Sequence, residues 1–187
     1  MRVTREMRAL RRRLLADTRL PRPADAGTII AGLCEAFARR RGGRPVDHRF
    51  SRFPVATASG LWLQLADRDL IVVEERTRPG HQLVIACHEL WHILEGTCDS
   101  HGPGLAVAAR LAGSDADLGA LLGTEQGLRA VVQQAAVRAG HDNPAEDRAE
   151  TFGLFMAREL TCLLPAPEEE QVPPAIERIR ISLGGGH

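Results

Sequence analysis

The sequence of 187 residues predicts an α+β fold that is mainly helical, with a small antiparallel sheet and an N-terminal helical extension. Three observations predict this fold. The length is that of one domain, and the 44% of hydrophobic residues are enough to build a buried core. Long stretches with helical spacing of apolar residues surround two short apolar runs that form a hairpin pattern.

The N-terminal extension contains two expected helices. Apolar residues recur there at steps of three and four, at Val3, Met7, Leu10 and Leu14. This spacing predicts an amphipathic helix over 3–20 that ends before two prolines. A second helix is expected over 28–41, where two glycines follow.

Short extended segments come next. Residues 44–53 are expected to be extended, and 61–65 and 70–75 are apolar runs joined by a polar turn at 67–69. Two apolar runs around such a turn are typical of a β-hairpin.

The rest of the chain is predominantly helical in pattern. A helix is expected from Gln82 to Gly96, and a long one from Asn143-Pro144 to about Leu164. Between them, residues 102–142 contain three Ala/Leu-rich stretches broken by glycines, and we expect them to form a helical insertion. Prolines mark a tail at 165–187 that contains a possible short helix.

The formal net charge is zero, but the charges are unevenly placed. Residues 1–50 carry 13 arginines and 5 acidic residues, whereas the remainder carries 11 and 19, and the chain has no lysine. The arginine-rich N-terminus lacks interleaved aromatic residues. A solvated helix face or a dock for an acidic partner is therefore favoured over direct binding of nucleic acid.

The composition also bears on the compartment. No stretch reaches the roughly 18 apolar residues that a membrane-spanning helix needs, and no apolar segment follows the basic start as in a secretory signal. The four cysteines form no CxxC pair, which fits free thiols in a reducing compartment. We therefore expect a cytoplasmic protein that does not interact with membranes.

One motif carries the chemistry. His88, Glu89 and His92 form His-Glu-x-x-His within an apolar helical run. Histidines four residues apart project from the same face of a helix, so both imidazoles can bind one zinc ion, at about 2.0–2.1 Å. Glu89 is then placed to deprotonate the attacking water rather than to bind the metal. The alternative is two helix histidines that only pack or hydrogen-bond.

A catalytic zinc needs a third protein ligand. At the spacing of metzincins a third histidine would fall on Cys98, so that pattern does not apply. Glu146 and Glu150 are four residues apart on the later helix, and both can face the histidines. One would bind zinc, and the other would accept a hydrogen bond from a ligand imidazole.

Two further features of this helix matter. Glu146 also fits the third helical position of a capping box that starts at Asn143, and this role is compatible with metal binding. Ala149 and Gly153 are small enough to let two helices approach closely.

Together these motifs resemble those of the ImmA/IrrE family of zinc metallopeptidases. The family pattern is a His-Glu-x-x-His helix followed by Glu-x-x-Ala-Asn/Asp-x-Phe-Ala. Glu146 matches the ligand and Glu150 the Asn/Asp, and the remaining matches are Ala149, Phe152 and Gly153. The resemblance covers roughly 59–164. It implies a minimal gluzincin-like core in which His88, His92 and Glu146 hold zinc between two helices.

The resemblance also implies a function. Family members often cleave or inactivate a DNA-binding repressor, and they occur in bacterial regulation and toxin–antitoxin loci. A regulatory zinc metallo-endopeptidase is therefore expected, with Glu89 activating water against a helix-turn-helix transcriptional repressor or an antitoxin-type partner. The alternative is a non-catalytic zinc-containing regulator or toxin component that binds such a partner without cleaving it.

The expected organisation is basic N-terminal helices over 1–44, a metallopeptidase-like domain over 45–164 and the tail over 165–187. The chain departs from the family pattern in three ways. His92 and Glu146 are 54 residues apart because of the insertion, and Glu150 replaces a shorter side chain. The chain also has no tyrosine, a common oxyanion stabiliser in zinc peptidases. His101, His141 and Arg148 are the candidates for that role, although each is equally compatible with a surface position.

Overall fold

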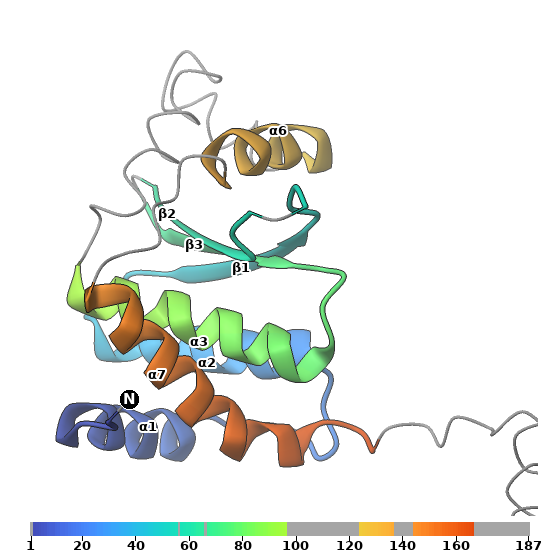
Figure 1. Cartoon of the computed structure of the whole chain (residues 1–187). Helices are drawn as coiled ribbons and strands as arrows, with labels where there is room; N and C mark the ends of the chain where they lie inside the picture. The colour runs from blue at the N-terminus through green and yellow to red at the C-terminus, as the bar shows by residue number, and fades with distance from the viewer. Residues whose placement is uncertain (1, 56, 66, 97–123, 137–143, 167–187) are drawn as a thin grey trace, which may run out of the picture.

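A computed structural model of the chain describes residues 2–55, 57–65, 67–96, 124–136 and 144–166. Its elements (Figure 1) are, in chain order, α1 (Arg5–Asp17), α2 (Ala26–Arg40), β1 (Val46–Ser51), β2 (Gly60–Gln64), β3 (Asp69–Glu74), α3 (Pro79–Glu95), α6 (Glu125–Ala136), α7 (Pro144–Leu160) and the short 3-10 helix η2 (Thr161–Leu163). The predicted α+β class is confirmed, and the predicted helices and strands within these ranges lie close to their expected positions.

The sheet separates two groups of helices. In Figure 1, α2 and α3 lie below the sheet, with α1 and α7 beyond them, and α6 lies above it. Residues of α1 and α2 share one buried cluster with α3 and α7, so the N-terminal helices belong to the same core as the rest of the domain. The part of the expected insertion that the structure describes, α6, covers the sheet face opposite α3.

The sheet is mixed rather than wholly antiparallel. Its strand order is β1-β3-β2. The predicted hairpin is antiparallel, with Gly60 opposite Val73, but β1 pairs with β3 in parallel, with Val46 opposite Asp69. β2 runs opposite to β1, and β3 then reverses direction again and inserts between them. The central strand therefore has one neighbour of each kind, and the expectation of an antiparallel sheet holds for the hairpin only.

Burial on both faces explains why the strands are so apolar. Trp62, Ile71 and Val73 point into the core that contains α2 and α3. Alternate residues belong to a second cluster on the α6 side, which contains Phe53, Leu61, Leu63, Leu65, Leu70, Val72, Leu128, Val131 and Val132. The period-2 alternation of a strand thus divides its apolar side chains between two cores.

Side-chain caps mark the starts of the first two helices. The Thr4 hydroxyl accepts a hydrogen bond from the backbone N–H of Met7 at 3.2 Å. The Asp25 carboxylate accepts one from Thr28 at 2.8 Å. Each cap satisfies an N–H group that the helix itself leaves without a partner, which explains why α2 begins two residues before its apolar pattern suggested.

A buried carboxylate joins the end of α2 to the sheet. Asp69 is fully buried at the start of β3. It accepts hydrogen bonds from Trp62 Nε1 at 3.0 Å, Arg41 at 2.9 Å and Arg44 at 3.2 Å. A buried charge is tolerated only when it is paired and hydrogen-bonded in this way. Arg41 and Arg44, which follow α2, therefore balance the charge that Asp69 buries at the start of β3.

None of the helices in the described ranges is long and apolar enough to span a bilayer.

A second buried carboxylate lies at the end of β3. Glu74 is buried and accepts hydrogen bonds from the backbone N–H groups of Phe53 and Arg76, both at 2.9 Å, and from the Arg76 guanidinium. The side-chain hydrogen bond from Arg76 is the main cause that lowers the pKa of Glu74 to about 2, against the opposing effect of burial. Glu74 thereby ties the loop after β1 to the end of β3.

This lowered pKa predicts a pH-dependent stability. Because the pKa falls from 4.5 to about 2 on folding, the stabilisation is complete above pH 4.5 and is lost as the pH falls toward 2. Glu74→Gln should lower the free energy of unfolding at pH 7. The difference in this free energy between variant and wild type should shrink as the pH falls from 4.5 toward 2. Urea denaturation at several pH values measures this difference. Glu125→Gln, at an exposed position, serves as control, and a difference for Glu74→Gln that does not vary with pH would contradict the assignment.

Candidate metal centre

The helix α3 presents the two motif histidines on one side. Pro79 occupies its first turn, and Gly96 ends it in the left-handed conformation, with φ of 65°. That conformation costs glycine little, which explains why the helix stops where the sequence predicts. The Nε2 atoms of His88 and His92 lie 2.9 Å apart, as expected for imidazoles one turn apart that face the same point.

Glu146 completes the group from α7. Its Oε2 lies 3.2 Å from His88 Nε2, and its Oε1 lies 3.4 Å from His92 Nε2. Ligand atoms of the three residues all lie within 4.8 Å of one another. We call His88, His92 and Glu146 the His–Glu cluster. The structure thus brings together the three residues that the motifs and the resemblance assigned to the metal.

The cluster exists because α7 packs closely on α3. Gly153 is buried, and a Cβ at this position would lie 2.7 Å from the carbonyl oxygen of Val84. Ala149, one turn earlier, is fully buried as well. Within the same contact between α3 and α7, the Trp91 and Phe152 rings pack with centroids 4.9 Å apart. The small residues let the helix backbones approach, as their positions predicted, and the approach carries Glu146 to the histidines.

The electrostatics of the cluster favour positive charge. The hydrogen bonds with His88 and His92 hold the pKa of Glu146 well below its ordinary value. Burial by itself would lower the pKa of His88. The hydrogen bond to Glu146 and the charges of Glu89, Glu146 and Glu150 outweigh that effect, so the pKa of His88 is raised. The same groups that attract a proton would attract a cation.

The donor set fits a divalent metal ion. Two nitrogens and a carboxylate oxygen are ligands that borderline metals such as zinc accept. Two ligands about 2.1 Å from an ion at a tetrahedral angle are about 3.4 Å apart, and the observed separations are 2.9 to 3.4 Å. His92 is buried, whereas the side chains of His88 and Glu146 are 22% and 25% exposed. The cluster could therefore hold a metal ion and is partly open to solvent at His88 and Glu146.

Glu89 lies between α3 and β2, next to His88 of the cluster. It is 2% exposed, and its carboxylate lies against Gly60 at the start of β2 and close to Ile85 of its own helix. Sequence reasoning identified Glu89 but missed Gly60. A glycine at the start of a strand pattern is a signal of close approach by another group, and it was available in the sequence.

The other predicted site residues have different outcomes. Glu150 is exposed and acts on His88 through its charge. Within the described ranges no hydrogen bond joins Glu150 to either imidazole, so that role stays a prediction. The guanidinium of Arg148 is held by Glu95 at 2.7 and 3.0 Å, a pair that joins the end of α3 to α7. His101 and His141 lie outside the described residues.

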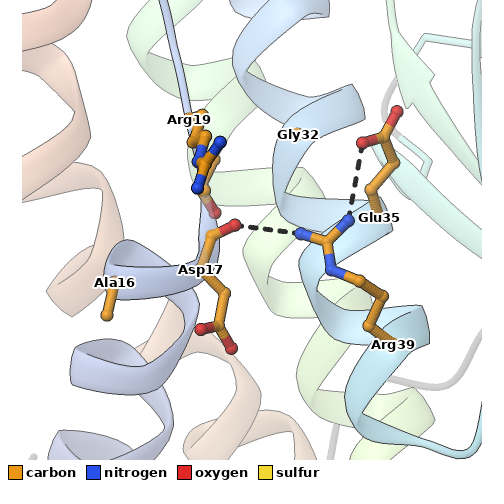
Figure 2. A pocket seen from close by; sticks show the side chains of 7 residues that line it. Ala16, Asp17, Arg19, Gly32, Glu35 and Arg39 are labelled. Atoms are coloured by element: carbon orange, nitrogen blue, oxygen red, sulfur yellow. Dashed lines mark hydrogen bonds and ion pairs between the residues drawn. The ribbon is translucent and has the colours of Figure 1, made fainter.

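A hollow lies between α1 and α2 (Figure 2). It has a volume of about 480 Å³ and is lined by Ala16, Asp17, Thr18, Arg19, Gly32, Glu35 and Arg39. Arg39 donates a hydrogen bond to the backbone oxygen of Asp17 at 2.9 Å and pairs with Glu35 at 3.7 Å. Because Arg39 is already paired with Asp17 and Glu35, this hollow is a weaker candidate for a functional site than the His–Glu cluster.

Comparisons of the chain with models of protein families, with curated proteins and with solved structures found no match. The function proposed below therefore depends on the geometry of the cluster and on the motifs.

The contact between Gly153 and the α3 backbone generates a prediction. In Gly153→Ala the new Cβ must push against the carbonyl oxygen of Val84, which cannot rotate away as a side chain would. We expect a loss of about 1–3 kcal/mol in the free energy of unfolding and weaker metal binding, because α7 carries Glu146 outward. Chemical denaturation with and without zinc measures both effects. Leu154→Ala, at the exposed neighbouring position, is the control, and equal behaviour of the two variants would contradict the prediction.

Proposed function

We propose that the chain is a zinc-dependent metallo-endopeptidase. The observation that carries this proposal is the convergence of His88 and His92 from α3 with Glu146 from α7, with Glu89 buried beside them. Two histidines and a glutamate are the ligand set of the zinc peptidases that keep one position open for chemistry. A metal site that served only as structure would have no use for Glu89.

Each residue then has a separate role. His88, His92 and Glu146 would hold the ion, which when bound supplies Lewis acidity to the scissile carbonyl and lowers the pKa of water. Glu89 takes the proton of the attacking water and delivers it to the leaving amine. Glu89 follows His88 directly in α3, and burial keeps its carboxylate away from bulk water. Arg148 pairs with Glu95, and its role as a stabiliser of the oxyanion stays a prediction.

The substrate class follows from the resemblance in motifs. Within the ImmA/IrrE family the substrate would be an exposed segment of a helix-turn-helix repressor or an antitoxin-type partner, in the cytoplasm. The spacing Glu-x-x-Ala supports this membership. In this chain it puts the ligand Glu146 and the small Ala149 on the α7 surface that contacts α3.

The metal assignment predicts about one zinc per chain. His88→Ala and Glu146→Ala should each lose most of the bound zinc, because each removes one of three ligands. Elemental analysis of the purified variants measures the ratio, with His81→Ala, at an exposed position of α3, as a variant that leaves the cluster intact. Full zinc occupancy in Glu146→Ala would contradict its assignment as a ligand.

The catalytic assignment predicts that Glu89→Gln keeps its zinc but loses hydrolysis. The amide cannot accept the proton of the attacking water, and we expect a rate at least about a hundredfold lower. Quenched fluorescent casein and a library of proteome-derived peptides, with new N-termini detected by mass spectrometry, are the probes. Glu125→Gln makes the same change at an exposed position of α6. If wild type and Glu89→Gln hydrolyse these probes equally, the non-catalytic regulator is the better description.

A further inference from the structure

The first residue of β2 lies against the carboxylate of Glu89. A Cβ built on Gly60 would be 2.4 Å from Glu89 Oε1 and 2.6 Å from Ile85 Cγ2. Both distances are far below ordinary van der Waals contact, so any side chain at position 60 would overlap with α3. The backbone of the edge strand therefore occupies the space beside the proposed general base.

The three groups in this contact differ in how freely they move. Gly60 is held by its pairing with Val73, and the preceding Ser59 accepts a backbone hydrogen bond from Glu74 at 2.8 Å. Ile85 Cγ2 branches next to the backbone of α3, whose core side is packed on the sheet. Glu89 Oε1 lies at the end of a side chain with three rotatable torsions. A Cβ at position 60 would thus displace the carboxylate most easily.

We propose that Gly60 is a positioning residue that sets where the Glu89 carboxylate lies relative to the His–Glu cluster. This inference rests on the proposed function. Gly60 would contact neither metal nor substrate. Its backbone limits how far the Glu89 carboxylate can move toward β2, and the lack of a side chain leaves the carboxylate in the position that it now occupies. Its glycine identity is explained by the adjacent carboxylate, since it does not adopt a positive φ.

The direct test uses a small zinc ligand rather than a substrate. Acetohydroxamate chelates zinc through two oxygens and can donate a hydrogen bond to a neighbouring carboxylate. Its affinity for zinc-loaded protein, measured by calorimetry, reports the position of Glu89. Losing one charge-assisted hydrogen bond lowers affinity by about tenfold or more. We expect this loss in both Gly60→Ala and Glu89→Gln, with zinc content unchanged.

A matched control is available on α3. Gly80→Ala introduces the same methyl group 3.3 Å from Thr161 Cγ2, away from the cluster, and should bind acetohydroxamate as wild type does. Wild-type affinity in Gly60→Ala, with weakened binding in Glu89→Gln, would overturn the inference and leave the proposed function intact. Wild-type affinity in Glu89→Gln would instead count against the catalytic assignment of Glu89 itself.

A double variant separates positioning from packing. Gly60→Ala/Ile85→Ala removes the contact with Ile85 Cγ2 and keeps the one with Glu89. Continued weak binding supports the inference, whereas recovery to the affinity of Ile85→Ala alone shows that Gly60 acts through packing. If Gly60→Ala alone does not fold, this double variant decides in its place.

Thermal denaturation gives a second measurement that needs no ligand. Gly60→Ala should lower the melting temperature less in a Glu89→Ala background than in wild type.

Discussion

The close contact between α3 and α7 is the constraint on which the His–Glu cluster depends. The histidines need only a regular helix, because their spacing alone makes them converge. Glu146 is different, since its carboxylate reaches them only when two helix backbones approach at Gly153 and Ala149. Trp91 and Phe152 fill the neighbouring space, and Arg148 with Glu95 joins the two helices at the same end. The ligand geometry is thus a by-product of helix packing.

Local patterns predicted much of this arrangement. The His-Glu-x-x-His spacing, the glycine that ends α3 and the proline at the start of α7 are properties of single helices, and each can be recognised within one turn. A third ligand on α7 was also predictable, because metal chemistry demands one and the small residues of α7 indicated a helix contact. These considerations left Glu146 and Glu150 as candidates, and the resemblance of the motif selected Glu146. The sequence therefore predicted the three residues of the His–Glu cluster, which could hold a metal ion.

Features that depend on distant parts of the chain could not be predicted. Nothing in residues 44–53 indicates that β1 pairs in parallel with β3, because that pairing depends on β3 inserting between the first two strands. The role of Asp69 was equally hidden, since its partners Arg41 and Arg44 come from the end of α2. The contact of Gly60 with Glu89 joins a strand and a helix that only the folded core brings together.

The second apolar cluster has a consequence for how compact this domain can be. Leu128, Val131 and Val132 of α6 cover the face of the sheet that α3 does not reach. Deleting the stretch between His92 and Glu146 to shorten their connection would leave Leu61, Leu63 and Val72 bare to water. An uncovered apolar sheet face is prone to self-association. Helix α6 therefore shields this face of the sheet from water, and a shortened version of the protein would need another surface to replace it.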